Sequence, residues 1–166
     1  MGKFIDLTSA DGFVFPAYVA EPAGTPKAAV VVLQEIFGVN SHIRSVADGY
    51  AAEGYFVVAP STFSRIGKAS VELGYTEADM KEGFGYKMAV DGMAEPAVMA
   101  DIQAAIDHAA QAGKVGNTTA YGGTSFNTSG SNVIPSRYST KKKEVNTTKV
   151  PATAHVIATS IPAVNA

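Results

Sequence analysis

The chain of 166 residues has no cysteine, no tryptophan and only three histidines. Without cysteine it cannot form disulfides or thiolate metal sites, and the three histidines are too scattered in the sequence to indicate a zinc site. No apolar run approaches the roughly 18 to 20 residues that a membrane-spanning helix needs. A net charge of −2 argues against nucleic acid as a partner. We therefore expect no metal, membrane or nucleic acid among its partners.

The N-terminal residues also lack the apolar core of a secretion signal, because an acidic residue, Asp6, interrupts them early. We therefore expect a cytoplasmic protein, and we expect it to be a monomer. The length fits one domain over residues 1–166, which would bury about two-thirds of the surface that the unfolded chain exposes. The apolar share of 46% and the charged share of 17% suit a globular protein.

The most informative stretch is an apolar run, Val30 to Leu33, that ends in Gln34 and Glu35. A continuous run of this length is typical of a strand buried on both faces of a sheet. Ligands of open α/β sheets bind beyond the carboxyl ends of such strands. Glu35 is therefore a candidate site residue, and the alternative is a loop carboxylate that faces solvent.

Two β-prone runs precede this strand, Phe4 to Thr8 and Phe13 to Val19. Asp11-Gly12 between them is a strong hairpin signal, so they are predicted to pair antiparallel. Pro16 lies inside the second run, and its missing N–H predicts an edge strand.

A strand-helix-strand unit is predicted from Ala28 to Ala59. Ser41 is the expected N-cap of the helix, and Gly54 is its expected end. The second strand, Tyr55 to Ala59, should then lie parallel to the first, because such crossovers are right-handed.

Two helices are predicted after a long loop. The first begins with a capping box at Thr76 to Asp79, and the second has proline in its first turn at Glu95-Pro96 and runs to Gly113. Residues 114–116 should enter the next strand. In folds of this kind that strand turns sharply into a helix and carries a nucleophile on the turn.

The sequence from Gln34 to Asn40, Gln-Glu-Ile-Phe-Gly-Val-Asn, resembles the motif of the dienelactone hydrolases, α/β hydrolases with a cysteine nucleophile. Further matches cover residues 1–116 almost continuously: Gly54-Tyr55, Ala59-Pro60, Phe63-x-Arg65, Leu73-Gly74-Tyr75, Asp101-Ile102-x-Ala104-Ala105-Ile106 and Lys114-Val115-Gly116. The resemblance implies a three-layer α/β-hydrolase fold with a mostly parallel sheet and an N-terminal antiparallel hairpin, incomplete at the C-terminus.

The resemblance also implies hydrolysis of a small cyclic enol ester, a dienelactone-type lactone, or of a related ester, through a covalent acyl-enzyme and without metal or organic cofactor. Glu35 would take the proton of the nucleophile. The nucleophile is expected at position 120, where this chain has alanine, Ala120, which has no nucleophilic atom. The backbone N–H groups of Ile36 and Tyr121 would form the oxyanion hole.

Phe37 and Arg65 are the expected substrate contacts. Arg65 suits bidentate recognition of a carboxylate, whereas Lys68 in the same loop is interpreted as solvated. Glu82 stands in the region where the family can carry a substrate-binding arginine, so the identity of the substrate stays open.

Two alternatives to this mechanism stay open. Ser125, Glu144 and His155 occur in the nucleophile, acid, base order of α/β hydrolases and could form another triad. The other alternative is a catalytically inert α/β scaffold or binding module, because the nucleophile, acid and histidine expected from the family are absent.

The composition changes after residue 115. Residues 1–115 hold 8 Lys and Arg against 14 Asp and Glu, whereas residues 116–166 hold 5 against 1. Ser, Thr and Asn rise from 11 of the first 115 residues to 20 of the last 51. Such low complexity normally predicts disorder, yet a hydrolase sheet needs buried strands here. Because Thr has the shape of Val and Asn that of Asp, one hypothesis is that some of these residues differ from those the gene encodes and that others are missing. The rival hypothesis is a truncated and diverged gene.

Overall fold

The computed structural model describes residues 1–93, 95–113, 118–121 and 155–158. The described strands are β1 (Lys3–Thr8), β2 (Val14–Ala20), β3 (Ala28–Leu33), β4 (Tyr55–Pro60), β5 (Thr118–Tyr121) and β6 (His155–Ala158). The described helices are α1 (Ser41–Ala52), α2 (Glu77–Asp91), α3 (Glu95–Ala112) and the short 3₁₀ helix η1 (Ser64–Ile66).

The strands form one sheet in the order β1-β2-β4-β3-β5, and β6 also pairs with β3. The β1–β2 and β2–β4 pairs are antiparallel, whereas β3 is parallel to β4, β5 and β6. The predicted hairpin and parallel unit are therefore confirmed.

The prediction that Pro16 marks an edge strand was wrong, because β2 lies between β1 and β4. The ladder between β2 and β4 begins only at Ala17, opposite Pro60. The carbonyl of Pro16 accepts a hydrogen bond from the N–H of Ser61, so the backbone of Pro16 faces a point just past the end of β4. A missing N–H costs little on that side of Pro16, because β4 has no residue opposite it.

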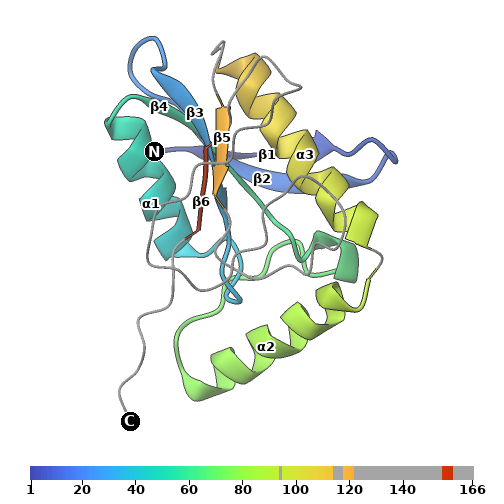
Figure 1. The fold of residues 1–166 in the computed structure, drawn as a ribbon. Coiled ribbons are helices and arrows are strands. Elements are labelled where there is room, and N and C mark those ends of the chain that lie inside the picture. The colour runs from blue at the N-terminus through green and yellow to red at the C-terminus, as the bar shows by residue number, and fades with distance from the viewer. Residues whose placement is uncertain (94, 114–117, 122–154, 159–166) are drawn as a thin grey trace.

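The sheet is covered on both faces, by α1 on one side and by α3 on the other (Figure 1). Successive strand residues point to opposite faces, and the core therefore divides into two clusters. One cluster joins the apolar face of α3 (Val98, Ile102, Ala105 and Ala109) to Phe15, Ala17, Val31, Leu33 and Val58 of the sheet. The other cluster joins Ile43, Ala47 and Ala51 of α1 to Tyr18, Val30, Val32, Val57 and Ala59 of the sheet. Burial of β3 and β4 on both faces explains their unbroken apolar sequences.

The helix ends agree with the sequence except at one cap. The N-cap of α1 is Asn40 and not Ser41, since the Asn40 side chain accepts a hydrogen bond from the N–H of Ile43. Asparagine and serine are about equally good caps, so sequence alone did not separate the two neighbours. Gly54 follows the helix with a φ of +97°, and Thr76 and Asp79 form the predicted capping box of α2.

Several predictions lie outside the described residues: the strand entry at 114–116, Ser125 and Glu144 of the alternative triad. Within the described part of the chain, no helix is long and apolar enough to cross a membrane.

Candidate active site

Polar side chains are buried where β3 ends. Gln34 is 3% exposed, Glu35 is 6% exposed and Asn40 is 4% exposed. Burial of a carboxylate is costly unless the protein compensates it, so such groups mark sites more often than exposed ones do. The interpretation of Glu35 as a solvent-facing loop residue is therefore wrong.

Residues 35–40 form a tight reversal, which we call the site turn. The N–H of Gly38 donates to the carbonyl of Glu35 at 3.3 Å, and Gly38 has a φ of +81°. Only glycine adopts this left-handed conformation without strain. The turn then ends at Asn40, which caps α1.

The segment from Val71 to Leu73 holds the site turn from outside. The N–H of Leu73 donates to the carbonyl of Phe37 at 2.9 Å, and the Asn40 side-chain amide donates to the carbonyl of Leu73 at 3.1 Å. A Cβ added at Gly38 would lie 1.9 Å from the carbonyl oxygen of Val71. The backbone at Gly38 is therefore in contact with this segment and has no space for a side chain.

Helix α2 touches the site turn at Ile36, which is 5% exposed. A Cβ added at Gly83 of α2 would lie 2.3 Å from the carbonyl oxygen of Ile36. The helix therefore approaches the Ile36 peptide group as closely as a residue without a side chain permits. The contact is with the carbonyl of Ile36, in the same residue as the N–H that is the expected oxyanion donor.

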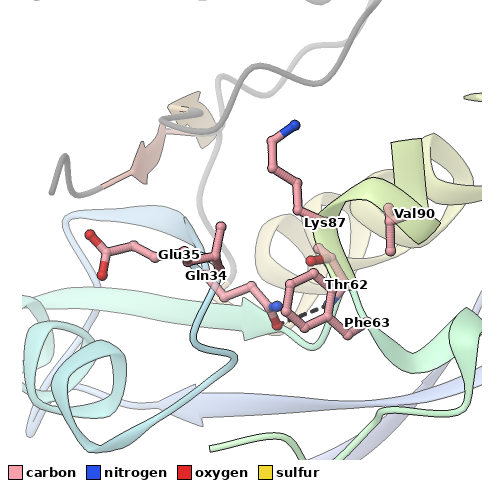
Figure 2. Close-up of a pocket in the computed structure, with 7 residues that line it drawn as sticks. Gln34, Glu35, Thr62, Phe63, Lys87 and Val90 are labelled. Atoms are coloured by element: carbon pink, nitrogen blue, oxygen red, sulfur yellow. Dashed lines mark hydrogen bonds between the residues drawn. The ribbon is translucent and has the colours of Figure 1, made fainter. Parts of the chain in front are cut away.

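Gln34 connects the end of β3 to the loop after β4. The backbone N–H of Thr62 donates to Oε1 of Gln34 at 3.1 Å, and both residues are buried. Figure 2 shows the Gln34 amide beside Thr62 and Phe63, with the Glu35 carboxylate pointing away from it. The side chains of Gln34 and Glu35 thus lie on opposite sides of the end of β3.

Ala120 and Tyr121 are the last two residues of β5, which runs parallel to β3. Parallel strands end at the same edge of a sheet, so β5 leads toward the edge that carries the site turn. The two strands pair at Ala29 and Thr118. In this register position 120 is level with Val31, before the level of Glu35.

Arg65 lies in a cluster of charged groups. Its Nε and Nη2 donate to the two Asp101 carboxylate oxygens at 2.8 and 2.7 Å, and its Nη1 lies 2.8 Å from Asp11. The guanidinium carbon lies 4.4 Å from the centre of the Phe13 ring. The hydroxyl of Ser9 also donates to Asp101. We call these five residues the Arg65 cluster. Its bidentate carboxylate partner is Asp101 of α3, so the described contacts of Arg65 are structural.

The other predicted residues are Phe37, in the site turn itself, and Lys68 and Glu82, which both contact Tyr86 of α2. Phe37 is 1% exposed and its ring packs edge-to-face on Tyr75 at 4.6 Å. Lys68 lies over the ring of Tyr86 at 5.2 Å, and Glu82 accepts a hydrogen bond from the Tyr86 hydroxyl. Lys68 is exposed, in agreement with its interpretation as a solvated residue, and its ammonium lies beside α2.

Sequence reasoning assigned no role of their own to Gln34, Gly83, Asp101 and the segment 71–73. The signal for Gln34 was its position, a polar residue inside an apolar strand end. Gly83 also stood out as glycine in the middle of a helix, where alanine is the better helix former. Among the residues that the structure describes, no group of three or more acidic or histidine side chains could hold a metal ion.

Comparison with known proteins agrees with this geometry. A family model described as "Dienelactone hydrolase family" matches residues 15–124. The chain belongs to the dienelactone hydrolase family. The match includes all of the site turn, the segment 71–73 and α2.

Named relatives of this dienelactone hydrolase family member include a carboxymethylenebutenolidase of Pseudomonas putida, 32% identical over 105 residues. A protein of Methylorubrum extorquens, provisionally named a carboxymethylenebutenolidase, is 37% identical over 123 residues. These alignments cover 63% and 74% of this chain but 43% and 39% of the relatives. The chain thus spans less than half the length of the curated relatives it matches.

A solved structure from Klebsiella pneumoniae, provisionally named a dienelactone hydrolase, is 31% identical with a TM-score of 0.53. The alignment covers 68% of this chain and 45% of the solved chain. The predicted α/β-hydrolase fold class is therefore confirmed, for a chain that matches part of the length of its relatives.

Proposed function

We propose that the protein hydrolyses a small cyclic enol ester of the dienelactone type, or a related ester, through a covalent acyl-enzyme. The observation that carries the proposal is the buried Glu35 carboxylate at the carboxyl end of the central strand β3, directly before Ile36. Family membership supports the reaction class, and the name of the Pseudomonas putida relative supports a lactone as substrate.

In the proposed reaction Glu35 accepts the proton of a nucleophile at position 120. The nucleophile attacks the ester carbonyl, the alcohol or enol leaves, and water hydrolyses the acyl-enzyme. The N–H groups of Ile36 and Tyr121 are the proposed donors to the oxyanion, and the loss of one such donor typically costs about 3 kcal/mol of barrier. Phe37 and Arg65 remain proposed substrate contacts, although Arg65 would have to exchange carboxylate partners.

Alanine at position 120 cannot act as a nucleophile, so the decisive experiment installs one. Ala120→Cys should create a thiol that is acylated by 4-nitrophenyl acetate, seen as a burst of nitrophenolate and as an acetyl adduct on the introduced thiol by mass spectrometry. Adding Glu35→Gln to this variant should slow acylation by at least tenfold, because general-base help typically contributes 10²–10⁴-fold.

The control is Ala120→Cys combined with Glu72→Gln, which changes a half-exposed carboxylate that pairs with Arg44. This double variant should retain the burst. A thiol that reacts with iodoacetamide but is never acylated by the ester would contradict the proposal and favour an inert scaffold. Turnover by the chain with alanine at 120 would point instead to a different nucleophile.

A further inference from the structure

Backbone hydrogen bonds at the site turn run in series toward the proposed oxyanion donor. The N–H of Leu73 donates to the carbonyl of Phe37 at 2.9 Å. That carbonyl shares a peptide group with the N–H of Gly38, which donates to the carbonyl of Glu35 at 3.3 Å. The Glu35 carbonyl in turn shares a peptide group with the N–H of Ile36. We call this series, from Leu73 to Ile36, the peptide relay.

The peptide relay sets the direction of the Ile36 N–H. A peptide group is planar, and in its trans form the N–H points away from the C=O. Because the Glu35 carbonyl points back to Gly38, the Ile36 N–H points out of the site turn. This N–H donates to no acceptor among the residues that the structure describes. It is therefore available to donate to an oxygen of the substrate.

The peptide relay also strengthens the Ile36 N–H as a donor. A carbonyl that accepts a hydrogen bond draws electron density from the nitrogen of its own peptide group, so the attached N–H becomes more positive. Hydrogen bonds in series polarise one another in this way, by about 10–30% per bond. The bond from Leu73 thus strengthens the Gly38 N–H, and the bond from Gly38 strengthens the Ile36 N–H.

Both ends of the first bond are held by neighbours that leave them little freedom. Gly38 has a φ of +81°, and an added Cβ there would lie 1.9 Å from the carbonyl oxygen of Val71. The carbonyl of Leu73 accepts a hydrogen bond from the side-chain amide of Asn40, the N-cap of α1, at 3.1 Å. The peptide relay is therefore built before any substrate arrives, as stabilisation of a developing charge requires.

We infer that Leu73 and Gly38 are positioning residues of the oxyanion hole, because their backbone N–H groups aim and polarise the N–H of Ile36. The inference rests on the proposed function, in which Ile36 donates to the oxyanion. It adds a role for Leu73, which lies outside the site turn and acts only through other residues. The benefit should appear in the transition state and not in substrate binding, since the negative charge on the oxygen develops only there.

The test replaces the N–H of Leu73 by an oxygen atom. The α-hydroxy analogue of leucine at position 73 turns one peptide bond into an ester bond and keeps the side chain. In the variant Ala120→Cys it should slow acylation by saturating 4-nitrophenyl acetate by about 2- to 8-fold. This range is 10–30% of a donor whose complete loss costs about 10²–10³-fold, on a logarithmic scale. The concentration of ester at half-saturation should stay the same.

Alkylation of the same thiol separates this role from general damage. In the reaction with iodoacetamide the thiolate displaces iodide from a saturated carbon, and no oxyanion forms. The alkylation rate should therefore be unchanged by the Leu73 analogue. A disturbance of the thiol or of Glu35 would slow both reactions.

Gly67 provides the matched control. Its N–H donates to the carbonyl of Ser64 at 2.9 Å, the same length as the Leu73 bond, but outside the peptide relay. The α-hydroxy analogue of glycine at position 67 should leave both the acylation and the alkylation rate unchanged.

A second measurement uses the full chain with alanine at position 120 and needs no turnover. The amide ¹⁵N signal of Ile36 responds to the hydrogen bond that the Glu35 carbonyl accepts. This signal should move when the Leu73 analogue is present and stay in place with the Gly67 analogue.

Acylation that is not slowed, equal slowing of acylation and alkylation, or an Ile36 signal that stays in place would each overturn the inference. A failure of the proposed function is a different result, in which the variant Ala120→Cys with the natural Leu73 is not acylated at all. The Ile36 signal would then still decide whether the peptide relay acts on this N–H.

Discussion

The site turn after β3 and the loop after β4 lie next to each other but are held in different ways. The site turn is fixed by backbone groups: Gly38 to Glu35, Leu73 to Phe37, and the close approach of Gly83 to Ile36. The loop after β4 has backbone hydrogen bonds as well, such as that from Ser61 to Pro16, but its link to α3 is made by the charged side chains of the Arg65 cluster. Backbone contacts demand particular small residues, whereas ion pairs demand particular partners. The two regions should therefore differ in the mutations and conditions that damage them.

The largest effect should come from Gly38→Ala in the site turn. The variant combines a left-handed φ with a Cβ placed 1.9 Å from the Val71 carbonyl oxygen. Strain and displacement together should cost roughly 3 kcal/mol or more of the free energy of unfolding. Urea denaturation measures this loss.

Gly12→Ala is the matched control, since Gly12 has a φ of +83° but nothing within 4 Å of an added Cβ. It should cost only about 1–2 kcal/mol, the conformational part. Equal losses in the two variants would show that the contact with Val71 contributes nothing.

Asp101→Asn should cause a similar loss of the free energy of unfolding through the Arg65 cluster, which holds the loop after β4. The Asp101 side chain is 1% exposed, and the change leaves the Arg65 guanidinium, 10% exposed, without its main counter-charge. Breaking a buried pair by removing one partner typically costs about 3–5 kcal/mol, and the retained amide oxygen places this variant at the lower end. Thermal unfolding at low and high salt measures it.

Glu72→Gln breaks the more exposed pair with Arg44 and serves as the comparison. It should change stability by less than about 1 kcal/mol. A loss at Asp101 as small as that at Glu72 would refute a buried structural role for the Arg65 cluster.

The two regions also differ in how well sequence predicted them. The apolar run of β3, the hairpin signal at Asp11-Gly12 and the capping box at Thr76 are local patterns, and each was confirmed. Glu35 was found because a single charge ended an apolar strand. The partner of Arg65, Asp101, lies 36 residues away in the sequence, and no periodicity links a loop to a helix face. Arg65 was therefore predicted as a substrate contact from the chemistry of its side chain and from the family-like Phe63-x-Arg65, without knowledge of Asp101 as its partner.

A smaller effect should separate Gly83→Ala from Gly85→Ala in α2. Alanine normally stabilises a helix interior by up to about 1 kcal/mol relative to glycine. An added Cβ at Gly85 meets nothing within 4 Å, whereas at Gly83 it meets the Ile36 carbonyl. Gly85→Ala should raise the melting temperature and Gly83→Ala should lower it.

In the variant Ala120→Cys, Gly83→Ala should also slow acylation, because a displaced Ile36 carbonyl would shift the N–H of the same residue. Acylation that stays unchanged despite a lowered melting temperature would separate the helix contact from the oxyanion role.

The smallest effect should be the acid sensitivity of the Arg65 cluster. The hydrogen bond from Arg65 holds the pKa of Asp11 below its usual 3.8. A lowered pKa in the folded state means that the stabilisation is complete above pH 3.8 and is lost as the pH falls through the lowered value. Asp11→Asn should therefore lower the melting temperature slightly at pH 7, and the difference from wild type should vanish near pH 2. A difference that persists at pH 2 would show that charge is not its origin.

The Arg65 cluster has an evolutionary consequence. Ser9, Arg65 and Asp101 come from three separate parts of the chain and meet at one buried point. A change at Arg65 or Asp101 alone leaves a buried charge without its partner. Replacing both with apolar residues of similar volume can leave the stability nearly unchanged. In evolution, the charged pair at positions 65 and 101 should therefore be replaced by an apolar pair through changes at both positions together. Positions 65 and 101 are expected to covary among homologues, a pattern that a residue selected only for substrate binding would not produce.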